Sequence, residues 1–345
     1  MSEQRQARLA FIGAGGFASA NIYPAIPMLP VIDLVAVCDI DRAKAERNAR
    51  CFGARAVYTD LHAMLDTEKP DGVFVIGPAP QQYELAPHVL KRGIPVYTEK
   101  PSANTAAEAK ELAEIAEANG TWGQCGYMKR FAACYTVAKE ILAKPEFGDL
   151  HIVNAKFGQG PYPQIWGIDS AKRAFLIGQC CHIFDLCRYF AGDPVSVSAL
   201  IKQVTDTQFT YLITVEYATG IIGHINLSCL EHTSGFRDIY EHLELAGLGT
   251  NITVDDMMKV RWVAPQDWST SAPSAGRYEH VLEPSWTGIG NNLRHNGYVG
   301  EVENFALRCT GERSTGPDLW DSYWSLKFGE AVYTSAHCGG AKVEV

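Results

Sequence analysis

Lys100 and His182 carry side chains that could take part in proton transfer. Lys100 follows an apolar run at residues 94–97, so we expect it just beyond the carboxyl end of a strand, where an ammonium group can donate to a hydroxyl or carbonyl oxygen. An imidazole such as that of His182 exchanges protons near neutral pH. Asp185 lies three residues later, so on a helix it would share a face with His182 and orient the ring. Such groups suit the removal of a proton from an alcohol.

A glycine-rich turn near the start of the chain suits the binding of phosphate groups. Gly13, Gly15 and Ala18 form the pattern GxGxxA between an apolar run and an expected helix. Glycine lets the backbone turn sharply and approach a pyrophosphate, and a helix N-terminus offers N–H groups to it. Asp39 ends the next apolar run about 20 residues later, where a carboxylate can bind a ribose. The turn and the carboxylate together predict a dinucleotide site.

The same carboxylate bears on the choice of cofactor. Asp39 would accept hydrogen bonds from the ribose hydroxyls and repel a 2′-phosphate, which favours NAD over NADP. Arg42 can reach a 2′-phosphate, so NADP stays the alternative. The further residues that we expect beside the cofactor are Gly16, Phe17, Ile40, Pro78, Gln82, Glu99 and Lys100.

Strands and helices alternate over the first third of the chain. This order predicts a doubly wound parallel sheet, the Rossmann architecture, and we assign residues 1–128 to a dinucleotide-binding domain. The expected strands are 8–12, 34–38, 72–76 and 94–97. The expected helices start near residue 16 and then span 41–51, 60–65, 82–91 and 105–118.

The later residues, 129–345, predict an α+β substrate-binding and oligomerisation domain with a large mixed or antiparallel sheet. Strand-like runs there follow one another directly, which is typical of such sheets. The expected strands are 195–200, 209–217, 221–229, 243–246 and 259–263. The expected helices are 171–190, 298–309 and 318–335, and residues 266–285 are expected to form a surface loop.

Composition narrows the class of protein. The 345 residues carry 30 Lys and Arg against 39 Asp and Glu, and this acidic balance argues against a nucleic-acid partner. No apolar run approaches the roughly 18 residues that span a bilayer, and no secretory signal is visible, so we expect a cytoplasmic protein without a membrane partner. The ten cysteines are irregularly spaced, which favours reduced thiols. Adjacent cysteines such as Cys180 and Cys181 rarely bind one ion, so we expect no metal.

Several segments, in order along the chain, resemble the Gfo/Idh/MocA family of glucose–fructose oxidoreductase, inositol dehydrogenase and rhizopine catabolism. The most specific is the run Glu99-Lys100-Pro101, with the GxGxxA turn upstream. The other matching segments are 71–78, 126–131, 178–185 and 296–305. The resemblance implies a nicotinamide cofactor in the first domain and a sugar, inositol or related polyol as substrate. It also implies a homodimer or homotetramer formed through the C-terminal sheet.

The resemblance also assigns roles to residues. Lys100 and His182 match the family's catalytic lysine and histidine, and Asp185 would support His182. Tyr127, Arg130, Trp166 and Gln179 are expected, with Lys100 and His182, to line the substrate site. We further expect a cis Lys100–Pro101 bond.

Two positions depart from the family pattern. Gly178 stands where the family often has an acidic residue or Asn, and Gln82 stands where it commonly has His. Gln179, Asp169 and Lys172 are the candidates to compensate for Gly178.

Two other functions remain open at the level of the sequence. One is glycosidic-bond cleavage with transient oxidation by bound NAD and no net turnover of the cofactor. The other is a non-catalytic NAD- and sugar-binding regulator. Retention of both Lys100 and His182 argues against the regulator, since binding alone needs neither.

Overall fold

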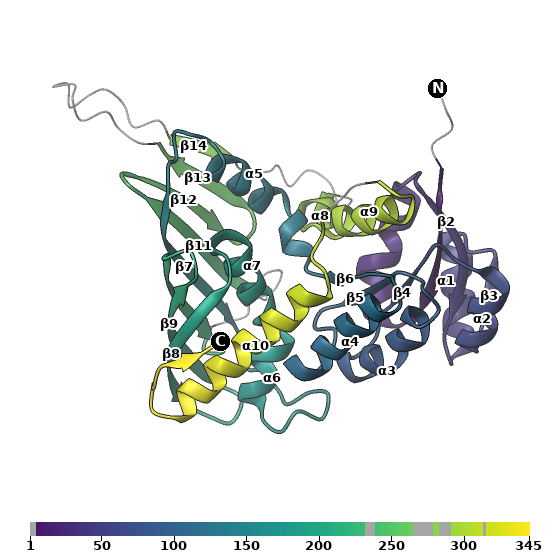
Figure 1. The fold of residues 1–345 in the computed structure, drawn as a ribbon, viewed down its shortest axis with the longest axis horizontal. Helices are drawn as coiled ribbons and strands as arrows, with labels where there is room; N and C mark the ends of the chain where they lie inside the picture. The colour runs from purple at the N-terminus through teal and green to yellow at the C-terminus, as the bar shows by residue number, and fades with distance from the viewer. Residues whose placement is uncertain (1–4, 232–238, 265–278, 283–290, 313–314) are drawn as a thin grey trace. The chain divides into compact units, whose positions relative to one another are not determined.

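A computed structural model describes residues 5–231, 239–264, 279–282, 291–312 and 315–345 (Figure 1). The chain forms two compact units. The first comprises residues 1–131 and 290–326, and the second comprises 132–289 and 327–345. Residues 290–326 thus belong to the first unit, whereas the division of the sequence at residue 128 gives them to the second domain.

The first unit is built on a six-stranded parallel sheet in the order β3-β2-β1-β4-β5-β6. This is the predicted doubly wound sheet, with its order reversing between β1 and β4. The strands are β1 (Ala7–Ile12), β2 (Ile32–Cys38), β3 (Ala56–Tyr58), β4 (Gly72–Val75), β5 (Val96–Glu99) and β6 (Gly123–Gly126). The short strands β3 and β6 were not predicted.

Helices surround this sheet, and local capping explains where they begin. Asp41 accepts hydrogen bonds from two backbone N–H groups at the start of α1, and Thr105 forms a reciprocal capping box with Glu108 at the start of α4. Figure 1 shows α3 and α4 side by side. The α-helices are α1 (Arg42–Phe52), α2 (Leu61–Glu68), α3 (Ala79–Leu90), α4 (Ala106–Ala118), α8 (Asn291–His295) and α9 (Tyr298–Cys309). A 3₁₀ turn, η3 (Met128–Phe131), ends the N-terminal part.

The helix expected after the glycine turn is irregular. It consists of a π-helical turn, η1 (Ala18–Ile22), and a 3₁₀ segment, η2 (Tyr23–Met28). Pro24 and Pro27 lack the N–H groups that an α-helix needs, which accounts for the interruption.

The second unit contains a nine-stranded mixed sheet in the order β14-β13-β12-β11-β7-β10-β9-β8-β15. The pair β7 and β10 is parallel and the other neighbours are antiparallel, which confirms the predicted mixed sheet. The strands are β7 (Leu150–Gln159), β8 (Pro194–Gln203), β9 (Phe209–Tyr217), β10 (Ile222–Ser228), β11 (Ile239–Gly247), β12 (Thr250–Asp255), β13 (Lys259–Val263), β14 (Glu279–Leu282) and β15 (Val343–Glu344).

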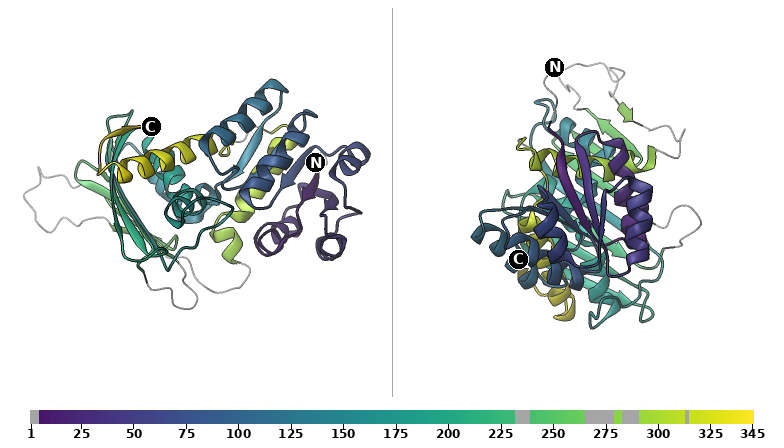
Figure 2. Two further views of the ribbon diagram at one scale, coloured as in Figure 1. Left: turned by 90° about the horizontal axis from the view of Figure 1, so that it is seen from below. Right: turned by 90° about the vertical axis from the view of Figure 1, so that its right-hand side faces the viewer.

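Helices cover one face of this sheet. They are α5 (Ala133–Leu142), α6 (Ala171–Gly178), α7 (Cys181–Ala191) and the later part of α10 (Leu319–His337), which contributes residues to both units. Side chains alternate along β9, where Tyr211 and Ile213 are buried under the helices and Leu212 is exposed on the other face. Figure 2 shows the curvature of the sheet and α10 in yellow.

Two expectations for this unit are wrong. Residues 171–190 form two helices rather than one, because the backbone N–H groups of Gln179 and Cys180 both donate to the carbonyl of Phe175 and end α6. Residues 279–282, expected in a loop, form β14 and pair with β13, while the rest of 266–285 lies outside the described residues. The strands β7, β12 and β15 and the helix α5 were not predicted. Among the described residues, none of the helices combines the length and apolar character needed to cross a bilayer.

Candidate active site

The glycine turn lies at the point where the order of the first sheet reverses. Gly13 follows β1 with a φ of 107°, and a Cβ there would lie 2.0 Å from the carbonyl oxygen of Ile76 just after β4. Only glycine fits such a position. A Cβ on Gly15 or Gly16 would instead meet no atom within 4 Å. The turn therefore leaves open space beside its backbone, as a pyrophosphate cradle requires.

Asp39 is fixed against this turn. One of its carboxylate oxygens accepts the backbone N–H of Ala14 at 2.7 Å, and the other accepts that of Asp41 at 2.8 Å. The carboxylate thus lies at the edge of the cradle, where it suits the adenosine ribose of a dinucleotide. Arg42 is turned to Glu46, with which it forms an exposed ion pair at 2.8 Å. The residues present therefore fit NAD.

Three other residues expected at the cofactor have different settings. Ile40 follows Asp39 with its side chain 94% exposed. Phe17 is half-exposed in the glycine turn, with its ring edge-on to Tyr298 of α9 at 6.3 Å between centroids. Pro78 occupies the position directly before α3 and follows β4 by three residues. Their contacts with a cofactor stay predictions.

Gln82 holds the backbone on both sides of Lys100. Its side-chain amide donates to the carbonyl oxygens of Glu99 and Pro101, both at 2.9 Å, and its side-chain oxygen accepts the N–H of Glu99 at 2.7 Å. The Lys100–Pro101 bond is cis, as expected. The sequence suggested that Gln82 lies near the cofactor; the structure shows a buried side chain that fixes the catalytic candidate's backbone.

Glu99 is a buried acid directly before Lys100. Its carboxylate accepts the backbone N–H of Lys100 at 3.1 Å and the hydroxyl of Tyr97 at 3.0 Å. Burial raises the pKa of Glu99 to about 7, while the nearby Lys100 ammonium and the Tyr97 hydroxyl act in the opposite direction. The strand β5 ends at Glu99, two residues later than expected, and the side chain of Glu99 is buried.

Two substrate-site candidates lie in the segment after β6. Tyr127 is buried. Arg130 forms a two-pronged ion pair with Asp321 of α10, at 2.8 and 3.3 Å. This ion pair fixes the guanidinium of Arg130 within the first unit. Contact of Arg130 with a sugar stays a prediction.

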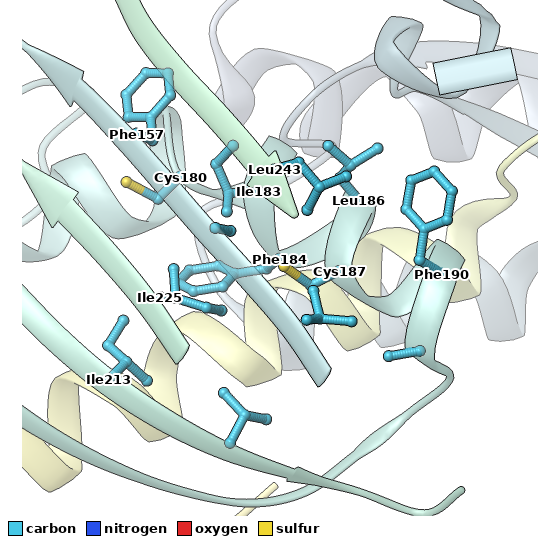
Figure 3. Close-up of a cluster of buried hydrophobic side chains, with 14 of the residues drawn as sticks. Phe157, Cys180, Ile183, Phe184, Leu186, Cys187, Phe190, Ile213, Ile225 and Leu243 are labelled. Carbon is cyan, nitrogen blue, oxygen red and sulfur yellow. The ribbon is translucent and has the colours of Figure 1, made fainter. Parts of the chain in front are cut away.

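In the second unit, α7 carries His182 and Asp185. Both side chains are buried, and the helix is anchored because its apolar residues pack on the sheet. Figure 3 shows Ile183, Phe184, Leu186, Cys187 and Phe190 of α7 with the strand residues Phe157, Ile213, Ile225 and Leu243. The break before α7 places His182 in its first turn, and the i, i+3 spacing sets Asp185 one turn on.

The space beside Gly178 is already filled. A Cβ at this position would lie 2.7 Å from the hydroxyl oxygen of Tyr162, 3.0 Å from Ile165 and 3.3 Å from Trp166. Trp166 has a φ of 53°, a left-handed backbone that non-glycine residues rarely adopt. Tyr162 was not predicted at this site, because a tyrosine in a loop carries no distinguishing pattern.

The residues considered as substitutes for an acid at position 178 have other surroundings. Asp169 lies 3.7 Å from Arg173 in a surface ion pair, and Lys172 donates to the side chain of Gln203 at 2.9 Å. Gln179 lies in the break between α6 and α7.

The glycine turn, Asp39 and the residues that support Lys100 thus belong to one unit, and His182, Asp185 and Trp166 belong to the other. That Lys100 and His182 act on one substrate oxygen stays a prediction. In the described part of the chain, no group of three or more His, Cys, Asp and Glu residues is arranged to hold a metal ion.

Known proteins share this architecture and sequence. Residues 7–127 match the oxidoreductase family GFO_IDH_MocA, described as an NAD-binding Rossmann fold, and residues 135–247 match the GFO/IDH/MocA C-terminal domain. The chain is 30% identical to D-glucoside 3-dehydrogenase of Escherichia coli (strain K12) over 58% of this chain and 59% of that protein. It is 25% identical to inositol 2-dehydrogenase of Acidothermus cellulolyticus over 94% of this chain and 90% of that protein.

A solved structure of levoglucosan dehydrogenase with NADH and levoglucosan has the same fold. The TM-score is 0.82 at 18% identity, with 99% of this chain and 100% of the other covered. With both family domains matched in order along the sequence, the chain belongs to the Gfo/Idh/MocA family of oxidoreductases and carries its NAD-binding Rossmann domain.

Proposed function

We propose that this protein is an NAD-dependent dehydrogenase that oxidises a secondary alcohol of a sugar, an inositol or a related polyol. The observation that carries the proposal is the support of Lys100. Gln82 clamps the backbone around this lysine at the carboxyl end of β5, in a domain whose glycine turn and Asp39 suit a dinucleotide. The relatives named as dehydrogenases of glucosides, inositol and levoglucosan favour this class of substrate.

In this proposal, Lys100 donates to the substrate hydroxyl oxygen and stabilises the negative charge that develops there. His182 takes the hydroxyl proton as the alcohol carbon loses hydride and becomes a carbonyl carbon. Asp185 orients the imidazole of His182. A bound nicotinamide cofactor supplies the acceptor for the hydride.

NAD is the expected cofactor. Asp39 presents its carboxylate at the glycine turn, where it would repel a 2′-phosphate. Arg42, the residue that could bind a 2′-phosphate, forms an ion pair with Glu46.

The exposed face of the nine-stranded sheet supports the proposed homodimer or homotetramer. Leu200 and Leu212 face each other across β8 and β9 and are 60% and 47% exposed, and Ile222 on β10 is 55% exposed. Apolar side chains grouped on one sheet face favour association with a second copy.

The proposal is tested with the purified chain, NAD⁺ and a panel of methyl glucosides, inositols and levoglucosan, with NADH formation followed by absorbance. We expect at least one compound to be oxidised, with NAD⁺ preferred over NADP⁺. Binding of NAD without turnover of any compound would contradict the proposal. Release of nitrophenol from a nitrophenyl glycoside without net NADH formation would instead identify the glycosidase alternative.

A further inference from the structure

A second buried acid, Glu301, lies in the first unit, near enough to Glu99 for the charge of Glu99 to raise its pKa. Glu301 is on α9 and is fully buried, and within the described residues neither oxygen of its carboxyl group has a hydrogen-bond partner. Its backbone carbonyl, in contrast, accepts the side-chain amide of Gln124 at 2.8 Å. A buried carboxyl group without such partners strongly favours its neutral, protonated form.

Aromatic packing fixes the tyrosine that bonds to Glu99. The ring of Tyr97 packs against Phe74 and Phe305, at 4.7 and 5.8 Å between centroids, so its hydroxyl has a set position. That hydroxyl donates to Glu99. On the side of β6, a Cβ on Gly126 would lie 2.5 Å from the Tyr97 hydroxyl oxygen and 2.9 Å from Glu99, so Glu99 is closely enclosed there.

The charged groups around the pair come from few elements. The Lys100 ammonium is near enough to lower the pKa of both acids. The charges of both carboxyl groups in turn raise the pKa of Tyr298 on α9. Strands β4 and β6 carry no charged residue. On η3, which packs against α9, the charged residues are Lys129 and Arg130, of which Arg130 pairs with Asp321.

The two acids differ in what stabilises their charged forms. Glu99 accepts the hydroxyl of Tyr97 and the N–H of Lys100, and hydrogen bonds of this kind favour a carboxylate. The hydrogen bond of the Tyr97 hydroxyl goes to Glu99; Tyr97 and Lys100 also lower the pKa of Glu301, but burial and the charge of Glu99 raise it more. Two carboxyl groups in one water-poor site do not both ionise readily, because each charge opposes the other.

We propose that Glu99 and Glu301 form a paired acid that supports Lys100, in which Glu301 keeps its proton while Glu99 ionises and serves as the counter-ion of Lys100. Glu99 is then a positioning residue for the catalytic lysine, a role that rests on the proposed function. Glu301 stays neutral in this pair, so only Glu99 provides a negative charge to the Lys100 ammonium.

The two buried acids make the stability of the fold depend on pH, whether or not a substrate is bound. Burial raises the pKa of Glu99 to about 7 and that of Glu301 well above the usual range, and the charge of Glu99 raises the latter further. A carboxyl group whose pKa is higher in the folded than in the unfolded state stabilises the fold most at low pH. That stability falls as the pH rises from about 4.3, the value in an unfolded chain, through the folded value.

The direct test is the infrared band of protonated carboxyl groups, measured on the full chain at pH about 8, where ordinary carboxyl groups are ionised. We expect the wild type to keep this band, Glu301→Gln to lose it and Glu99→Gln to retain it. Glu111→Gln is the matched control, since Glu111 also accepts a tyrosine hydroxyl, that of Tyr83 at 2.6 Å, but on the surface. A band that survives in Glu301→Gln, or is absent from the wild type, overturns the proposal.

Thermal unfolding between pH 5 and 8 gives a second readout if Glu301→Gln folds poorly. The melting temperature of the wild type should fall over this range by about 2–4 °C more than that of Glu99→Gln, because the variant lacks the titrating acid. Glu111→Gln should follow the wild type. Equal falls in the wild type and Glu99→Gln would overturn the proposal.

The link to Lys100 is tested by turnover of whichever substrate the panel identifies. The acid side of the wild-type profile of kcat/KM should show two ionisations, Glu99 and His182, and Glu99→Gln should show one, with a lower kcat and an unchanged KM for NAD⁺. Two ionisations in the variant would overturn the positioning role. If no compound is oxidised, the proposed function fails, while the infrared and thermal results still decide whether the paired acid exists.

Discussion

Asp39 shows how one side chain serves both local structure and the choice of cofactor. Its two carboxylate oxygens bond to the backbones of Ala14 and Asp41, so it ties the glycine turn to the end of β2. Its charge then lies where the ribose of a dinucleotide is expected. The spacing in the sequence was enough to predict that this acid lies beside the glycine turn, because the GxGxxA turn and the end of the second strand are neighbours in one local unit.

We predict that Asp39→Ala narrows the preference for NAD⁺ over NADP⁺ at least about tenfold. The substitution removes the charge that repels a 2′-phosphate and an acceptor of ribose hydroxyl groups. The measurement is kcat/KM for both cofactors at a fixed substrate concentration, with Glu84→Ala at an exposed position on α3 as the control. An unchanged ratio in Asp39→Ala would remove Asp39 from cofactor selection.

Gln82 illustrates a residue whose position, but not its role, followed from the sequence. We predict that Gln82→Ala lowers the free energy of unfolding by about 1–3 kcal/mol, since it leaves the buried N–H of Glu99 and two carbonyl groups without their partner. It should also lower kcat, because the backbone of Lys100 loses its clamp.

Denaturant unfolding and steady-state kinetics check this prediction. Gln81→Ala is the matched control, as Gln81 is the neighbouring residue on α3 and is exposed. Equal stability of the two variants would show that the clamp contributes little.

At the scale of elements, most helices and strands follow from local patterns. The capping residues Asp41 and Thr105 and the alternation along β9 predict their elements well. The break between α6 and α7 does not follow in the same way, since residues 171–190 read as one amphipathic helix. The break depends on the carbonyl of Phe175 accepting two N–H groups, a detail of tertiary packing.

The proximity of Glu99 and Glu301 could not be predicted from local sequence patterns either. It requires α9 to return to the first unit from a position about 200 residues later in the chain, which periodicity cannot reveal. The segment around Glu301 was noted only as a family-like helix, and its acid carried no signal of burial.

The end of α6 offers a prediction at this scale. Gly178→Ala should destabilise the chain by about 1–3 kcal/mol, since the new Cβ would lie 2.7 Å from the hydroxyl oxygen of Tyr162. Tyr162→Ala should relieve most of this cost, so the two changes should be non-additive in a double-mutant cycle of unfolding free energies. Additive effects would mean that Tyr162 does not occupy the space beside Gly178.

At the scale of the whole molecule, the open face of the second sheet is the feature with the largest consequence. Leu200→Glu combined with Leu212→Glu places two charges at facing positions on β8 and β9. We predict that the double variant is a monomer and the wild type a dimer or tetramer, as measured by light scattering at micromolar concentration. Leu248→Glu, at an 86% exposed position in the turn between β11 and β12, is the control. A monomeric wild type would contradict the proposed assembly.

The central claim is that Lys100 and His182 act together on one substrate oxygen. It is tested most directly by the rate of NADH formation in a single turnover, measured for Lys100→Ala, His182→Ala and the double variant. We predict that each single change lowers the rate by about 10²–10⁴-fold and that the double change is little worse than the more damaging single one, because the two groups work as a unit. Losses below about tenfold for each single variant, or losses that multiply as for independent sites, would contradict the account.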